Sequence, residues 1–219
     1  ACCGREARVA GMIPVQPQPE PGFFDAEVRT TGLAHLKAKG HALDQPLPAG
    51  ASIEPHWRGD CLTALHQAYG GVCAYLCVFV ERITGGMSVD HFIAKSALAG
   101  LAYEWSNYRL ACSVMNSRKR DFDDVLDPFE LEPDWFRLDL TCGRIFPNPE
   151  LEPEQTTLVT HTISRLGLDD PLCRELRVRW FDEYLTEPLP ESYLRRKSPF
   201  VWAEAQRQGL LLNSPASSA

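Results

Sequence analysis

The segment 89–119 constrains the fold of this chain more than any other, because it carries four polar side chains that can handle a proton or a metal ion. Taken singly, an Asp-His pair or an asparagine says little, since such residues are common in turns and on surfaces. Taken together, in this order and at this spacing, they predict one compact site. The four residues are Asp90, His91, Asn107 and Asn116.

The pattern around these four residues predicts a strand, a loop, a second strand and a short helix. Apolar and β-prone residues alternate with turn signals, and the small residues between the two strands favour a loop. The expected ranges are strands at 87–91 and 107–112, a loop at 94–106 and a helix at 114–122. Upstream we expect helices within 24–40 and over 57–69, then at 73–80 an apolar, β-prone run that forms a buried strand or a core segment.

The composition is typical of a soluble globular protein, with 44% hydrophobic and 23% charged residues. No apolar run reaches the roughly 18–20 residues that a membrane-spanning helix requires, and the first residues lack the apolar core of a signal peptide. We therefore expect a cytoplasmic protein with no membrane partner and with reduced thiols. The formal net charge of −7 argues against a protein that coats nucleic acid, although a nuclease needs a positive field only at its site.

Hydrolysis of a phosphodiester bond requires that water be deprotonated and that charge on the phosphoryl oxygens be neutralised. A neutral His91 can take the proton, because the pKa of imidazole lies near neutral pH. The carboxylate of Asp90 and the amide oxygen of Asn116 suit one divalent cation, Mg²⁺ or Mn²⁺. Neighbours on an ideal strand point to opposite faces, so a strand end or a bulge is needed to bring Asp90 and His91 to one site.

Basic residues gather in the same segment of the chain. Arg118, Lys119 and Arg120 form its densest basic cluster, and Arg109 and Lys95 are near in sequence. Positive charge beside a metal site is consistent with local phosphate binding, so all five are candidate substrate-binding residues. The alternative for the cluster at 118–120 is an ordinary solvated helix face.

The stretch 73–119 resembles HNH endonucleases of the ββα-metal superfamily. The resemblance extends over residues 57–130, and it is strongest to small bacterial HNH proteins, including those paired with an ATPase in Septu-type phage defence. The residues that carry it are Cys73-Ala-Tyr-Leu-Cys77, Val89-Asp-His-Phe-Ile-Ala-Lys-Ser96, Tyr103-Glu-Trp-Ser-Asn107 and Cys112-Ser-Val-Met-Asn116-Ser-Arg-Lys119.

The resemblance implies a metal-dependent endonuclease in which His91 is the general base, while Asp90 and Asn116 hold a single Mg²⁺ or Mn²⁺. It also implies that Asn107 braces the loop between the strands and that Lys119 contacts phosphate. The implied substrate is nucleic acid, DNA rather than RNA, cut to leave 5′-phosphates. The alternative function is an inactive subunit on the same scaffold, bound to an ATPase partner; the acidic balance favours it and the intact site disfavours it.

Many zinc-containing members of this family carry two Cys-x-x-Cys pairs, but here Leu76 and Met115 stand at the second position of each pair. Tetrahedral zinc needs four ligands, and the remaining thiols of Cys73 and Cys112 do not suffice. We therefore expect no structural Zn²⁺, with apolar packing in its place. The alternative zinc ligands are Cys77 together with Cys61 or a histidine.

The whole chain predicts an α+β protein with a ββα-metal core, an N-terminal extended arm and C-terminal helical decoration. Prolines dominate the arm, and hairpin and helical patterns follow the core. The C-terminal patterns are a hairpin at 135–146 and helices at 155–166, 171–185 and 200–212. The expected divisions are an over-extended start or cloning remnant at 1–11, the arm and short helix at 12–56, the core at 57–130, the hairpin and helices at 131–213, and a disordered tail at 214–219.

Overall fold

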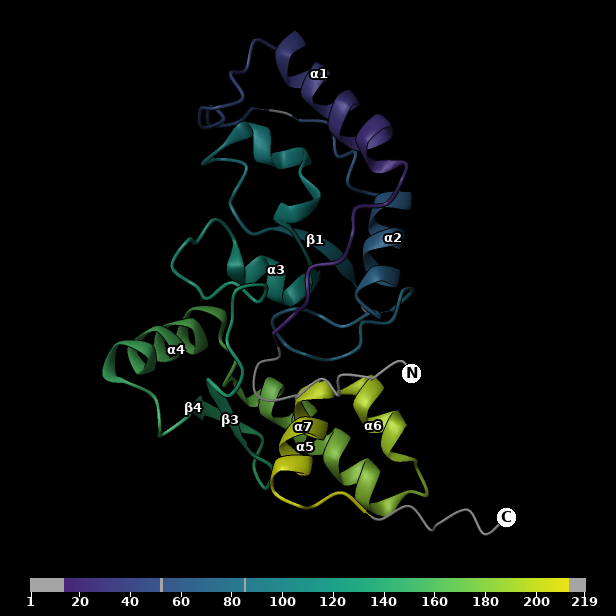
Figure 1. Cartoon of the computed structure of the whole chain (residues 1–219), viewed down its shortest axis with the longest axis vertical. Coiled ribbons are helices and arrows are strands. Elements are labelled where there is room, and N and C mark those ends of the chain that lie inside the picture. Colours follow the sequence, from purple (N-terminus) through teal and green to yellow (C-terminus); the bar gives the residue numbers. More distant parts are fainter. Residues whose placement is uncertain (1–13, 52, 85, 213–219) are drawn as a thin grey trace, which may run out of the picture. The chain divides into compact units, whose positions relative to one another are not determined.

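The computed structural model describes residues 14–51, 53–84 and 86–212 (Figure 1). It is an α+β fold, with helices and two separate two-stranded antiparallel sheets. The chain divides into two compact units, one formed by Gln16–Asp127 and the other by Ala1–Val15 with Pro128–Ala219. The proline-rich arm from residue 16 thus belongs to the same unit as the segment 57–127. The divisions expected at 1–11 and 214–219 lie outside the described residues.

The first unit is built around a hairpin followed directly by a helix. Strand β1 (Met87–His91) pairs antiparallel with β2 (Tyr108–Cys112), so that His91 lies opposite Tyr108 and Met87 opposite Cys112. Helix α3 (Ser113–Lys119) begins immediately after β2 and lies beside β1 (Figure 1). The helix expected to reach residue 122 ends at Lys119, because Arg120 adopts a positive φ of 51° that no helix can continue.

The connection between the two strands contains short 3₁₀ helices instead of the plain loop expected at 94–106. They run from Ala99 to Tyr103 (η2) and from Trp105 to Asn107 (η3). Small residues permit this tight coil, and the buried Trp105 anchors its end. The strand that follows therefore begins at Tyr108, one residue later than predicted.

The elements before the hairpin differ from prediction in two places. A π-helix at Asp25–Thr30 (η1) runs into α1 (Thr31–Ala38), and α2 covers Asp60–Ala68. Helix α2 starts later than the predicted residue 57, because Gly59 has a φ of 63°. The apolar run at 73–80 is a buried core segment and not a strand: it forms turns, with one isolated bridge from Val72 to Phe79.

The core of the first unit is aromatic. The rings of Trp105 and Tyr108 meet Phe24 edge-on, at centroid distances of 5.5 and 5.7 Å. A Cβ atom added to Gly32 of α1 would lie 2.3 Å from the ring of Tyr103, so only glycine lets this helix approach so closely. These buried rings fix the strand connection against η1 and α1.

The second unit combines a hairpin with four helices. Strands β3 (Phe136–Asp139) and β4 (Arg144–Pro147) form the predicted hairpin. The helices α4 (Pro153–Leu166) and α5 (Pro171–Thr186) match their predicted patterns closely, with a capping box formed by Glu152 and Gln155 at the start of α4. The last predicted helix, 200–212, is shorter: α7 covers Pro199–Arg207, and α6 (Glu191–Lys197), which was not predicted, precedes it.

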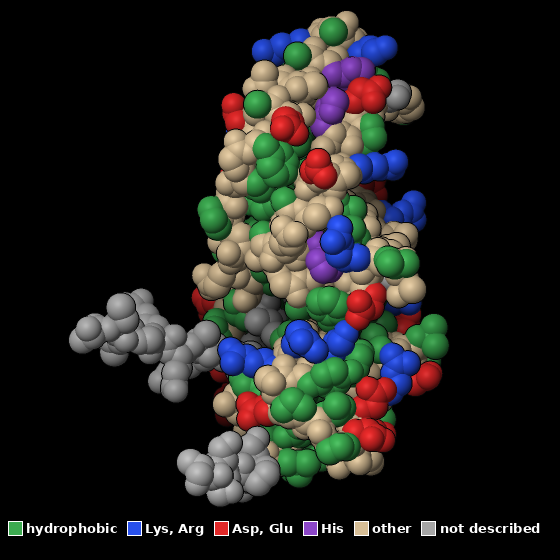
Figure 2. Space-filling model, turned by 90° about the vertical axis from the view of Figure 1, so that its right-hand side faces the viewer, with side chains coloured by type: hydrophobic (Ala, Val, Ile, Leu, Met, Phe, Trp, Pro, Cys, Tyr) green, Lys and Arg blue, Asp and Glu red, His purple; other side chains and the backbone are tan. Residues whose placement is uncertain are grey.

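None of the helices within the described residues is long and apolar enough to cross a membrane. On the face drawn in Figure 2, Lys and Arg side chains are interspersed with Asp and Glu side chains. Any positive field for an anionic substrate must therefore be local.

Candidate functional site at the β1–β2–α3 junction

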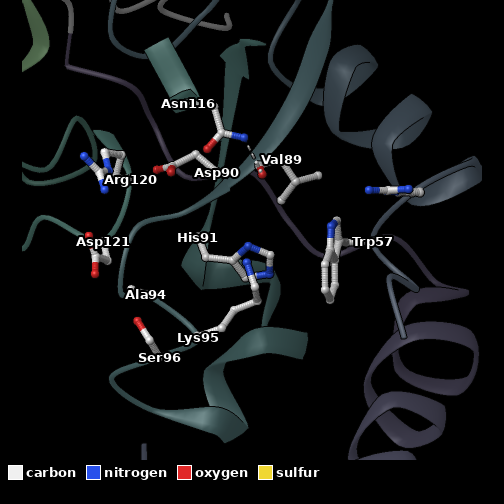
Figure 3. A pocket seen from close by; sticks show the side chains of 11 residues that line it. Trp57, Val89, Asp90, His91, Ala94, Lys95, Ser96, Asn116, Arg120 and Asp121 are labelled. Atoms are coloured by element: carbon white, nitrogen blue, oxygen red, sulfur yellow. Dashed lines mark hydrogen bonds between the residues drawn. The ribbon is translucent and has the colours of Figure 1, made fainter. Parts of the chain in front are cut away.

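A cavity of about 510 Å³ opens where β1 ends beside α3 (Figure 3). Its walls come from the end of β1 and the following turn, from α3 and the residue after it, and from the segment that precedes α2. Three of the four predicted site residues line it. The lining side chains used below are Trp57, Asp90, His91, Lys95, Asn116 and Arg120.

The imidazole of His91 is buried and held in one orientation. Its Nε2 atom lies 3.0 Å from the carbonyl oxygen of Ala102. Because a carbonyl only accepts hydrogen bonds, Nε2 carries the proton, and Nδ1 of the neutral ring keeps its lone pair. Burial lowers the pKa of His91 to about 3, and the positive charge of Lys95 acts in the same direction. The ring is therefore neutral at physiological pH and keeps one unprotonated nitrogen, but a pKa this low makes that nitrogen a weak base until a bound anion raises the pKa.

The carboxylate of Asp90 is the most buried group of the cavity, with 1% of the residue exposed. It accepts a 2.5 Å hydrogen bond from the hydroxyl of Tyr75. Burial raises the pKa of Asp90 above its usual value, while the Tyr75 hydrogen bond and the charges of Lys119, Arg109 and Lys95 oppose this rise. A cation bound at the carboxylate would oppose it further, because positive charge favours the ionised form.

The side chain of Asn116 ties α3 to β1. Its Nδ2 donates to the carbonyl oxygen of Val89 at 3.2 Å (Figure 3, dashed line). With the amide nitrogen used in this way, the oxygen Oδ1 remains as an acceptor at the cavity. Asp90 and His91 both line the same cavity although they are neighbours on a strand, because β1 ends at His91.

Asn107 does not line the cavity, and it holds the connection between the strands instead. Its Oδ1 accepts from the backbone N–H of Ile93 at 2.8 Å, and its Nδ2 donates to the carbonyl oxygens of Ile93 and Leu101 at 2.9 and 3.0 Å. Three hydrogen bonds from one buried side chain fix the turn that follows His91 and the coil that carries Ala102. Asn107 therefore braces the connection between the two strands.

Two of the five predicted basic residues line the cavity. Lys95 follows the turn after β1, and its Nζ lies 5.4 Å from the centroid of the Trp57 ring. Arg120 follows α3 and is exposed. The Trp57 ring also meets His91 edge-on at 4.7 Å, so that it fixes one wall for both residues.

The other three predicted basic residues do not line the cavity. Lys119 is fully buried, and its Nζ donates to the carbonyl oxygen of Phe92 at 2.9 Å. Arg109 is buried and binds Asp127 through two hydrogen bonds of 2.8 and 2.5 Å. Arg118 is half-buried on α3, outside the lining. The structure thus gives Lys119 and Arg109 scaffold contacts in place of the phosphate contacts that were expected.

Two groups at the site escaped prediction. Tyr75, which donates a hydrogen bond to Asp90, lies in a turn within 73–80, where the apolar pattern allowed a strand. Arg58 lines the cavity beside Trp57, and both precede α2 instead of lying within it. Only the aromatic and basic character of the pair at 57–58 could have signalled a wall of a site.

The cysteines form a second feature, at the opposite end of the hairpin. The Sγ atoms of Cys73 and Cys112 lie 4.0 Å apart, and backbone N–H groups of Leu76 and Cys112 approach Cys73 Sγ at 3.5 and 3.4 Å. The side chains of Leu76 and Met115 are buried. Within the described ranges, no three His, Cys, Asp or Glu side chains form a group that could hold a metal ion.

No protein-family model matches this chain, and no curated protein sequence matches it.

Proposed function

We propose that this protein is an HNH-type endonuclease that hydrolyses phosphodiester bonds of nucleic acid, with DNA favoured, and that β1, β2 and α3 form a ββα-metal core. The observation that carries the proposal is the orientation of three side chains around one cavity. His91, Asp90 and Asn116 each use one atom to bind the scaffold, and each has another atom for substrate, water or an ion.

His91 would act as the general base. The Ala102 carbonyl fixes the Nε2 tautomer, so Nδ1 can accept the proton of a water molecule that attacks phosphorus. Asn107 supports this geometry by bracing the coil that carries Ala102. Trp57 and Tyr108 meet the ring edge-on at 4.7 and 5.1 Å and prevent it from turning.

The proposed cofactor is one divalent cation, Mg²⁺ or Mn²⁺, held by Asp90 and Asn116. Both side chains offer oxygen, the ligand that these ions prefer, and one carboxylate with an amide leaves positions for water and phosphate. When bound, the ion would neutralise charge on the phosphoryl oxygens and stabilise the leaving oxygen. The Tyr75 hydroxyl holds the carboxylate in place, as partners of metal ligands commonly do.

Lys95 and Arg120 would hold the phosphate group at the mouth of the cavity. Both line it, and they come from opposite sides of the hairpin junction, one after β1 and one after α3. Acidic and basic side chains are mixed on the face drawn in Figure 2, so we expect attraction for an anionic backbone to come from local residues such as these two.

The alternative is an inactive subunit that uses this scaffold to bind a partner such as an ATPase. The net charge of −7 favours it, because a protein of this charge does not attract DNA over its whole surface. The two functions differ in one measurable property, which is cleavage that depends on His91.

The test is nicking of supercoiled plasmid with Mg²⁺ or Mn²⁺, for wild type, His91→Gln and the control His66→Gln. His66 is also a buried histidine, with Nε2 2.8 Å from the carbonyl oxygen of Val80, but it does not line the cavity. Loss of the base is expected to lower the rate by about 10²–10⁴-fold in His91→Gln alone. Equal nicking by both variants, or no nicking by the wild type with either ion, would contradict the proposal.

A further inference from the structure

The thiols of Cys73 and Cys112 are placed to react with each other. The two residues are far apart in sequence, yet their Sγ atoms lie only 4.0 Å apart, the chain having brought the turn after α2 against the end of β2. A disulfide requires the two Sγ atoms to approach to roughly 2.05 Å.

The two sulfurs differ in access. Cys73 is fully buried, whereas Cys112 is partly exposed at the start of α3. The hydrogen bond from the Cys73 thiol lowers the pKa of Cys112 to about 6, and backbone N–H groups of Met115 and Val114 act in the same direction. Burial raises the pKa of Cys73. Cys112 is thus the accessible thiolate, and Cys73 is a protonated thiol behind it.

We propose that Cys73 and Cys112 are a peroxide-sensitive modification site, in which Cys112 is oxidised first and Cys73 then closes a reversible disulfide. In the first step, the Cys112 thiolate attacks hydrogen peroxide: an S–O bond forms as the O–O bond breaks, Cys112 becomes a sulfenic acid, and the departing hydroxide takes up the proton that the thiol had released and leaves as water. In the second step, Cys73 sulfur attacks Cys112 sulfur as its own proton departs; the S–O bond breaks, the S–S bond forms and a second water leaves. Two thiols and one peroxide therefore give one disulfide and two waters.

The disulfide would join the segment of Tyr75, which holds the cavity residue Asp90, to the helix of Asn116, which lines the cavity. Cys73 precedes Tyr75 by two residues, and Cys112 precedes Asn116 by four, within the turn that begins α3. The modification itself does not depend on the proposed nuclease activity, because it is measured on the thiols. If no disulfide forms, the proposed nuclease function is unaffected; if no nuclease activity is found, the proposed disulfide is unaffected.

The test is peroxide titration of the reduced full chain, followed by blocking of free thiols and peptide mapping. Cleavage after Tyr69 and after Tyr75 separates Cys73 from both Cys61 and Cys77, so the linked partner of Cys112 is identified directly. We expect a Cys73–Cys112 peptide that has lost two hydrogens, that forms before other cysteines react, and that a thiol reductant separates.

Three variants sharpen the test. Cys112→Ser should abolish the linked peptide, and Cys142→Ser, which removes an exposed thiol, should leave it unchanged. Cys73→Ser, whose hydroxyl can still donate a hydrogen bond to the Cys112 sulfur, should accumulate a Cys112 sulfenic acid that dimedone traps. Oxidation of Cys112 to sulfinic acid without a disulfide, linkage to Cys77 instead, or a purified protein whose two thiols already hold a metal ion would overturn the proposal.

Discussion

The two ends of the β1–β2 hairpin are built differently. At one end, which we call the polar end, Asp90, His91 and Asn116 surround a cavity, and hydrogen bonds to Tyr75, Ala102 and Val89 orient them. At the other, the thiol end, Cys73 and Cys112 meet among the buried side chains of Leu76 and Met115. For the polar end we propose metal-assisted hydrolysis, whereas the side chains described at the thiol end are two thiols and buried apolar groups.

The difference shows what each end needs from its residues. A catalytic site depends on the direction of individual lone pairs, so every side chain there must be fixed by a specific partner. A structural corner needs only to hold two segments together, and buried apolar contacts can do so without ligands.

The largest expected effect comes from converting the thiol end into a metal site. The 4.0 Å between the two Sγ atoms is close to the edge of about 3.8 Å in a tetrahedral zinc site with Zn–S bonds of about 2.3 Å. The double variant Leu76→Cys with Met115→Cys should therefore bind one Zn²⁺ per chain, with a free energy of about 10–16 kcal/mol. Elemental analysis measures the zinc content, and a double variant that stays free of zinc would contradict the expectation that the thiol end can be converted into a metal site.

The second-largest effect is expected from substitution of Asn116. Asn116→Ala removes a proposed ligand and the bond between α3 and β1, and it should slow plasmid nicking by more than about 100-fold, the upper range for loss of a partner behind a ligand. Ser117→Ala changes the next, exposed residue of α3 and serves as the control. Similar nicking rates for the two variants would exclude Asn116 from the site.

A smaller effect is expected from the hydroxyl of Tyr75. Tyr75→Phe removes the hydrogen bond to Asp90 and should weaken metal affinity or activity by about 10–100-fold. The matched control is Tyr184→Phe, which removes a buried hydroxyl of the second unit that accepts a hydrogen bond from the backbone N–H of Leu212 at 2.8 Å. If both variants retain full activity, the Tyr75 hydroxyl does not position the carboxylate.

The smallest expected effects are those of substitutions at Lys95 and Lys119, which should change different properties. Lys95→Met should weaken DNA binding by up to about 5-fold, the range of an exposed ion pair of up to 1 kcal/mol. Lys119→Met should leave binding unchanged and lower the unfolding temperature, because the Phe92 carbonyl loses its donor. Fluorescence anisotropy and thermal unfolding measure the two properties. The reverse pattern would return Lys119 to the phosphate-binding role predicted from its sequence.

The sequence predicted the positions of β1 and β2 well, because strand alternation is a local property, and the structure brings the predicted residues Asp90, His91 and Asn116 to one cavity. The sequence could not show that Lys119 and Arg109 turn toward Phe92 and Asp127, since those partners are set by tertiary packing. For the same reason, the apolar run at 73–80 did not decide between a buried strand and a core segment. A buried turn and a buried strand share one composition, and only the positive φ of Cys77 distinguishes them here.

The most direct test of the proposed metal site is a Mn²⁺ titration followed by electron paramagnetic resonance, on wild type and Asp90→Asn. Asparagine keeps the shape of Asp90 and removes its charge, so the variant isolates the ligand's electrostatic contribution. We predict one Mn²⁺ per wild-type chain and an affinity at least about 10-fold weaker in the variant. A wild-type chain that binds no Mn²⁺, or a variant that binds it equally well, would contradict the assignment of the polar end as a divalent-metal site.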